Sequence, residues 1–226
     1  FEPTDRASGN YDTHYRQLKA AGIKPIACIN QTPEWLLQDY PQKPSRKDFK
    51  PVSRGESTVE PRSYRHFARF LYQLAARYGR VRADAQQLTI HSKSRWTGDG
   101  PNVPKTGLDL LEYIEVWNEP DKWWSDPEAF FSPDEYAAML SACYDGHEGR
   151  LGAGHGIKKA DPSMQVVMAG LSNFNLDYLK GMNDWFKKHR RDKKFAAEIV
   201  NFHHYSNKNQ ALKPNFEAGI APEADQ

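Results

Sequence analysis

The residue in this sequence best placed for acid or base chemistry is Glu119. It follows residues 113–117, whose β-branched and aromatic side chains are typical of a strand buried in a sheet. Asn118 and Pro120 help to end that strand, because proline donates no hydrogen bond to a sheet and disfavours helical geometry in its predecessor. A carboxyl group that can release or take up a proton is therefore expected at the carboxyl end of a core strand. In barrels of alternating strands and helices, chemistry is built at that end.

A second group of polar side chains follows the last predicted strand, residues 198–202. His203 and Tyr205 are two residues apart, so in an extended segment their side chains point to the same face. His204 then points to the opposite face and is interpreted as structural. A histidine near a core is more often a packing residue than a functional one, so His203 has both interpretations.

The elements that must position these side chains follow a regular order. Strands are predicted at residues 23–29, 113–117, 165–170 and 198–202. Helices are predicted at residues 11–21, 62–78, 132–144 and 176–188, with a short helix beginning at Pro33. The basic run 187–194 is interpreted as a solvated helix end. Strands that alternate with helices predict a parallel sheet with helical crossovers, an α/β fold.

Composition narrows the function classes. The chain has 226 residues, of which 38% are hydrophobic, enough for a substantial core in one or two domains. Its 31 basic and 29 acidic residues give no electrostatic argument for binding nucleic acid or a membrane surface. No apolar run approaches ~20 residues, so no bilayer span is predicted. The compartment stays open, with a secreted or periplasmic location favoured.

The two cysteines, Cys28 and Cys143, form neither a disulfide framework nor a metal-ligand pattern. Both are expected to be small buried side chains. The sequence therefore predicts neither a metal nor another cofactor.

The segment Glu115-Val116-Trp117-Asn118-Glu119-Pro120 resembles the end of the fourth barrel strand of clan A glycoside hydrolases. The closest resemblance is to family 39, which contains β-xylosidases and α-L-iduronidases. The resemblance implies a (β/α)8 TIM barrel, which typically takes about 250 residues. On this interpretation residues 1–226 are part of a longer chain and cover barrel strands three to six. The rest of the barrel is expected from the same parent chain.

The resemblance also implies roles for individual residues. Glu119 would be the general acid/base of a retaining double-displacement mechanism. Its pKa would be raised by burial among Trp117 and Trp123 and by a second nearby carboxylate. Asn118 would bind the sugar 2-hydroxyl, although asparagine also serves simply to form turns.

Further sugar contacts are expected from the same resemblance. His203 would line the sugar-binding site, and Tyr205 would orient the nucleophile. Asn30, Trp35 and Trp123 are predicted to contact substrate, an oligosaccharide or polysaccharide whose degradation the protein would catalyse. Trp35 is equally well interpreted as a side chain that packs on its own short helix.

Two features of the clan have no match in the sequence. The nucleophilic glutamate at the end of strand seven is not found, and Glu217 and Glu223 follow no predicted strand. The clan's second-strand arginine has no counterpart either. The nucleophile is therefore expected outside this chain.

Two other classes stay open. A carbohydrate-binding barrel without catalysis would keep the aromatic residues and lack the nucleophile. A metal-dependent hydrolase using His203, His204 and a carboxylate ranks last, because adjacent side chains on a strand point to opposite faces and cannot readily share one ion.

Overall fold

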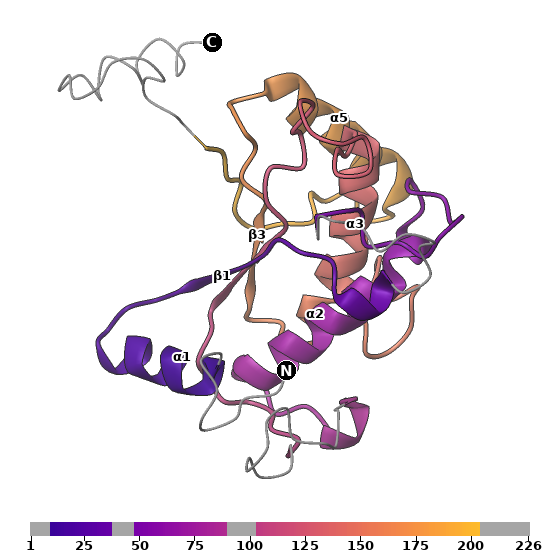
Figure 1. Cartoon of the computed structure of the whole chain (residues 1–226). Helices are drawn as coiled ribbons and strands as arrows, with labels where there is room; N and C mark the ends of the chain where they lie inside the picture. Colours follow the sequence, from indigo (N-terminus) through magenta and orange to yellow (C-terminus); the bar gives the residue numbers. More distant parts are fainter. Residues whose placement is uncertain (1–9, 38–47, 90–102, 204–226) are drawn as a thin grey trace, which may run out of the picture.

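The computed structural model describes residues 10–37, 48–89 and 103–203, which form a parallel three-stranded sheet with helices α2, α3 and α5 on one side (Figure 1). The strands are β1 (Ile26–Ile29), β2 (Tyr113–Val116) and β3 (Gln165–Met168), in the order β1-β2-β3. The α-helices are α1 (Tyr11–Ala20), α2 (Arg65–Tyr78), α3 (Pro133–Asp145), α4 (Ile157–Ala160) and α5 (Leu176–His189). Short 3-10 turns are η1 (Glu34–Leu36), η2 (Pro61–Tyr64) and η3 (Ala85–Gln87).

The centre of the sheet is β2, which pairs in parallel with both neighbours. Ile114 lies in register with Ala27 on β1 and with Val166 on β3, and its side chain is fully buried. Parallel neighbours need long crossovers, and the helical segments between the strands supply them. The structure therefore confirms three of the four predicted strands and their parallel order.

The fourth predicted strand is wrong as a continuous strand. Residues 198–202 make only two isolated parallel bridges, Ile199 to Val167 and Phe202 to Leu171. A side chain interrupts the ladder, because Oε2 of Glu198 accepts the hydrogen bond of the Val166 N–H at 2.8 Å. The segment still follows the edge of β3 and runs beside it in parallel.

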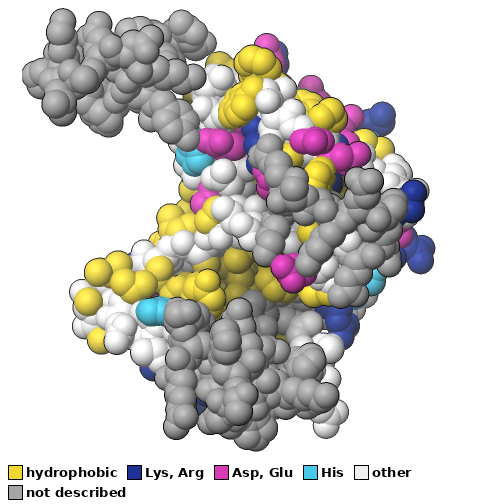
Figure 2. Space-filling model, viewed as in Figure 1, with side chains coloured by type: hydrophobic (Ala, Val, Ile, Leu, Met, Phe, Trp, Pro, Cys, Tyr) yellow, Lys and Arg dark blue, Asp and Glu magenta, His cyan; other side chains and the backbone are white. Residues whose placement is uncertain are grey.

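One face of the sheet is covered and the other is open at β1. Ile26 is 55% exposed and Cys28 is also exposed, so the prediction of a buried Cys28 is wrong; Cys143 is buried as predicted. The reason is that β1 is the outermost strand among the described residues and lacks a second neighbour there. Hydrophobic side chains gather over α1 and β1 in Figure 2. The described strands form an open sheet, and the TIM barrel stays a prediction.

The covered face is packed by amphipathic helices. Phe67, Leu71 and Leu74 of α2 recur at helical spacing and are buried. A capping box begins α3, because the side chains of Ser132 and Glu135 each accept the other residue's backbone N–H. α3 packs against both α2 and α5, and so joins the helical layer. No helix in the described ranges has the length and apolarity to cross a membrane.

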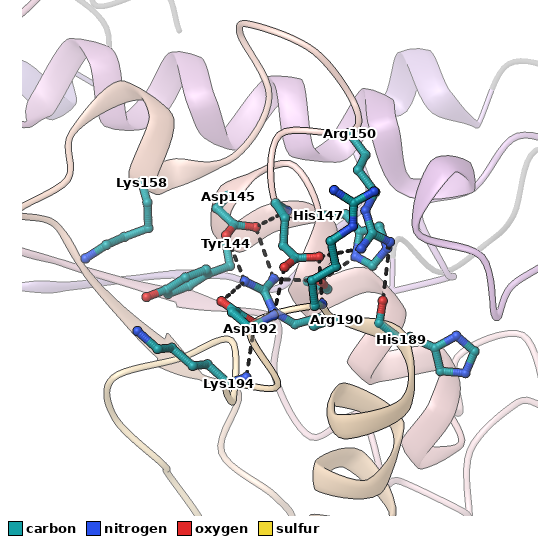
Figure 3. A network of polar contacts seen from close by, with 12 residues as sticks. Tyr144, Asp145, His147, Arg150, Lys158, His189, Arg190, Asp192 and Lys194 are labelled. Atoms are coloured by element: carbon teal, nitrogen blue, oxygen red, sulfur yellow. Dashed lines mark hydrogen bonds and ion pairs between the residues drawn. The ribbon is translucent and has the colours of Figure 1, made fainter.

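A polar network joins the carboxyl ends of α3 and α5 (Figure 3). The side chain of Arg190 is fully buried and contacts the carboxylates of Asp145 and Asp192 at 2.8 and 2.9 Å. It also donates to Oγ of Ser141 at 2.9 Å. The predicted solvated helix end is therefore confirmed for the exposed residues 187–189 and wrong for Arg190, which two carboxylates hold inside.

Candidate active site

The chain leaves β2 through a turn that is hydrogen-bonded to both neighbouring strand ends. The Trp117 N–H donates to the carbonyl of Ile29, and the Glu119 N–H donates to the carbonyl of Gly170, both at 3.0 Å. Trp117 and Glu119 have φ angles of 85° and 44°, in the left-handed region that residues other than glycine seldom adopt. Such backbone costs on the order of 1–3 kcal/mol per residue and persists only where its surroundings enforce it. The two hydrogen bonds supply that enforcement.

The carboxylate of Glu119 meets the imidazole of His203. Oε1 of Glu119 lies 2.8 Å from Nδ1 of His203, although 84 residues separate them in sequence. Their side chains are 16% and 29% exposed, so the pair is shielded but reachable from solvent. The His203 N–H donates to the carbonyl of Leu171 at 2.7 Å, which fixes the backbone that carries the ring. The ends of β2 and of the segment after β3 thus build one acid–imidazole pair.

Gly170 makes this approach possible. A Cβ added at Gly170 would lie 2.6 Å from Cδ2 of His203 and 3.1 Å from Nδ2 of Asn201. Real Cβ atoms do not approach other atoms as closely as the first of these distances, so any side chain here would displace the imidazole. The glycine is therefore required by the position of His203.

Sequence reasoning missed a second carboxylate, Glu115, in the middle of β2. Glu115 is 8% exposed, and its Oε1 accepts from the Gly170 N–H and from Nδ2 of Asn201, both at 2.9 Å. The sequence does contain a signal for Glu115: a charged residue between two apolar residues of a buried strand, Ile114 and Val116, must find hydrogen-bond donors inside the protein. Both glutamates therefore form hydrogen bonds with Gly170: the carboxylate of Glu115 accepts from its N–H, and the backbone N–H of Glu119 donates to its carbonyl.

Glu115 also influences Cys28, its neighbour on β1. Sγ of Cys28 donates to the carbonyl of Trp117 at 3.5 Å. Although Cys28 is exposed as a residue, partial desolvation of its thiol and the negative charge of Glu115 raise the pKa of Cys28 to about 12. A thiol that stays protonated at neutral pH is a poor nucleophile, so Cys28 is not a catalytic candidate.

The turn after Glu119 is anchored by two buried contacts. Asp121 accepts from the backbone N–H and the hydroxyl of Ser172 at 2.8 and 2.9 Å. Lys122 pairs with Asp48 at 2.6 Å, and its own N–H donates to the carbonyl of Glu119 at 3.3 Å. Asp121 and Lys122 are both less than a tenth exposed. The loop is thereby fixed from both sides.

This anchored turn presents two tryptophans to solvent. Trp123 is 75% exposed and Trp124 55% exposed, with their rings 5.8 Å apart and nearly perpendicular. Trp123 therefore does not bury Glu119, contrary to the sequence-based expectation. Trp35 is 49% exposed and meets His66 edge to face at 6.1 Å. Asn30 is exposed directly after β1.

Trp117 behaves differently from these exposed tryptophans. It is fully buried and packs edge to face against Phe67 and Phe131. Its role is to fill the core beneath the turn. Asn118, between Trp117 and Glu119, is half-buried.

The structure brings together Glu119 and His203 among the predicted site residues. Tyr205, His204, Glu217 and Glu223 lie outside the described residues. Over residues 10–37, 48–89 and 103–203, no group of three or more His, Cys, Asp or Glu side chains is arranged to hold a metal ion.

Comparison with known proteins gives a distant likeness in structure alone. No protein-family model matches the chain, and no curated protein matches it. A solved structure, that of AbfB, "a family 51 alpha-L-arabinofuranosidase from Bifidobacterium longum", is similar with a TM-score of 0.42 and 16% sequence identity. The likeness covers 95% of this chain and 34% of that one. The similar structure is that of a family 51 enzyme, whereas residues 115–120 of this sequence resemble family 39. The likeness is too distant for an activity to be transferred to this chain.

Proposed function

We propose that this chain carries the acid/base part of a retaining O-glycoside hydrolase that acts on oligosaccharides or polysaccharides. The observation that carries the proposal is the contact between Glu119 and His203. A shielded carboxyl group at the end of a central parallel strand, 2.8 Å from an imidazole, is a suitable proton donor and acceptor. Support also comes from the sequence of residues 115–120, which resembles clan A and, most closely, family 39.

In this mechanism Glu119 acts twice. It first protonates the glycosidic oxygen as the bond to the leaving group breaks. As a carboxylate it then removes a proton from the water that hydrolyses the glycosyl-enzyme intermediate. The nucleophile would be a second carboxylate at roughly 5 Å, supplied by a part of the protein outside this chain. No cofactor is needed for either step.

His203 would orient the acid during both steps. With a proton on Nδ1, the imidazole donates to Oε1 of Glu119 and thereby fixes the orientation of the carboxyl group. The same hydrogen bond stabilises the carboxylate after it has given up its proton. His203 is therefore expected to set the direction in which Glu119 transfers its proton and the stage of the reaction at which it does so.

Substrate contacts are proposed for the residues around this pair. Asn118 would bind the sugar 2-hydroxyl, and Trp123 would stack on the apolar face of a sugar ring. Trp35 and Asn30, which follow β1, would contact more distant sugars. Tyr205 would orient the nucleophile.

The test is the Glu119→Gln variant of the full protein. On a natural glycan, whose leaving group needs a proton, the rate should fall by about 100-fold to 10,000-fold. On an aryl glycoside with an acidic phenol as leaving group, bond cleavage should fall much less. Glu112→Gln is the matched control, because Glu112 lies at the other end of the same strand and pairs with Lys24. Wild-type cleavage of the glycan by Glu119→Gln would disprove the assignment.

A carbohydrate-binding protein without catalysis is the second candidate. The exposed, anchored Trp123 and Trp124 favour it, because aromatic faces bind sugar rings whether or not a bond is broken. The parental sequence after Gln226 distinguishes the two functions. A predicted strand that ends in glutamate there supports the hydrolase, and its absence supports the binding protein.

A further inference from the structure

Glu115 is a buried carboxylate that the proposed mechanism does not use. It is 8% exposed and lies in β2, four residues before Glu119. Burying a carboxylate is unfavourable by several kcal/mol unless hydrogen bonds compensate it. An apolar residue of similar volume would suit the centre of a parallel strand better. The presence of Glu115 therefore needs a reason beyond packing.

The partners of Glu115 are neutral donors. Its Oε1 accepts from the Gly170 N–H and from Nδ2 of Asn201, both at 2.9 Å. These donors come from the residues after β3 and from the segment that contains His203. One carboxylate on the central strand β2 thus joins these two segments.

Both donors lead directly to the acid–imidazole pair. The peptide of Gly170 donates to Glu115 through its N–H and accepts at its carbonyl from the Glu119 N–H at 3.0 Å. Asn201 is two residues before His203, and the His203 ring occupies the space where a Cβ at Gly170 would lie. A shift of either Gly170 or Asn201 would therefore move one member of the pair against the other.

We propose that Glu115 is a positioning residue that sets the contact between Glu119 and His203 by holding Gly170 and Asn201. Its effect on turnover rests on the proposed hydrolase function, whereas its effect on the geometry of the pair does not. Glu115 acts through its hydrogen bonds, so a glutamine can replace it: the amide oxygen accepts the same two donors. An apolar residue cannot replace it, because both donors would lose their acceptor inside the protein.

The first measurement is independent of catalysis. The ring-nitrogen NMR signals of His203 report the hydrogen bond between Nδ1 and Glu119, and Glu119→Ala provides the spectrum of the broken contact. Glu115→Gln should keep the wild-type signals. Glu115→Ala and Asn201→Ala should shift them toward those of Glu119→Ala. Asn201→Ala leaves Glu115 and Gly170 unchanged, so it gives an answer even where Glu115→Ala fails to fold.

The second measurement is steady-state kinetics of the full protein on a natural glycan, whose leaving group needs the proton from Glu119. Glu115→Ala and Asn201→Ala should lower kcat on the order of 100-fold with little change in KM, because a misplacement of about 1 Å has that effect. Glu115→Gln should retain kcat. Glu112→Gln is again the control, since its carboxylate pairs with Lys24 at 37% exposure and has no contact with Gly170 or Asn201.

The outcomes separate the two proposals. Wild-type His203 signals in both alanine variants would overturn the positioning role. Alanine-like behaviour of Glu115→Gln would also overturn it, because charge rather than hydrogen bonding would then be required. Shifted His203 signals in a protein that cleaves no glycoside would support the positioning role and remove the proposed function.

Discussion

The imidazole of His203 occupies the space beside Gly170 that a side chain would need, with Cδ2 only 2.6 Å from the position of an added Cβ. The same glycine holds Glu119 through a backbone hydrogen bond of 3.0 Å. Both members of the acid–imidazole pair therefore depend on one residue without a side chain.

Gly170→Ala should separate His203 from Glu119. Overpacking of this kind costs about 1–3 kcal/mol of unfolding free energy. We expect kcat to fall on the order of 100-fold as well, because the acid loses its orienting partner. Gly181→Ala is the control: its Cβ would lie 2.8 Å from Cβ of Pro133, far from the pair in the helical layer. Equal effects of the two substitutions on kcat would contradict the role assigned to Gly170.

Trp123→Ala should weaken substrate binding without destabilising the fold. Because Trp123 is 75% exposed, its loss should change the free energy of unfolding by less than ~0.5 kcal/mol. The KM for a polysaccharide should rise about fivefold, the equivalent of one aromatic contact. The KM for a short aryl glycoside should not change. The control is Tyr11→Ala, which removes a 57% exposed aromatic residue from α1 and should alter neither of these two KM values.

His147 should make the fold less stable in mild acid. Burial and the positive charges of Arg150 and Arg190 lower the pKa of His147 to about 4, from an ordinary value of 6.5. Between these two values the unfolded chain binds a proton that the folded protein excludes, so stability falls as the pH falls. In this range each unit by which the pH falls lowers the free energy of unfolding by about 1.4 kcal/mol.

Urea unfolding across this pH range measures the effect. The His147→Asn variant should lose this part of the pH dependence, and asparagine tolerates the φ of 50° at this position. The relevant quantity is the difference in unfolding free energy between wild type and His147→Asn at each pH, because the carboxylates that titrate at lower pH are common to both proteins. Parallel pH profiles for wild type and variant would refute the prediction.

Arg190→Met should destabilise the protein strongly and leave the acid–imidazole pair intact. The substitution leaves Asp145 and Asp192 without their shared partner, a loss of about 3 kcal/mol. The surface pair of Lys180 and Asp177 is the comparison, because its side chains are 76% and 95% exposed. Lys180→Met should cost about 0–1 kcal/mol. Similar unfolding free energies for both variants would show that the buried network adds no stability.

The sequence predicted what depends on local pattern. Residues 113–117 indicated β2 because four of the five side chains are β-branched or aromatic, and Pro120 marked its end. The carboxylate of Glu119 followed from that boundary. The capping box at Ser132 was equally visible, because its partner Glu135 is only three residues away.

What depends on distant partners could not be predicted in the same way. The exposure of Cys28 depends on which strands lie beside β1, and sequence alone does not give that neighbour. The burial of Arg190 depends on Asp145, 45 residues earlier. Glu115 stood out only as a charge in an apolar strand, because its donors at Gly170 and Asn201 lie 55 and 86 residues away.

The left-handed backbone at Trp117 and Glu119 sets two selective pressures against each other. A laboratory screen for heat resistance alone would reward a change that relaxes this bend at position 119, glycine above all. At position 117 it would not, because glycine would remove the buried ring of Trp117 from the core. A screen for turnover would reject changes at position 119, since they remove the carboxyl group. Consensus or thermostabilised versions of this protein should therefore be checked first at position 119 before any loss of activity is attributed to the substrate-binding loops.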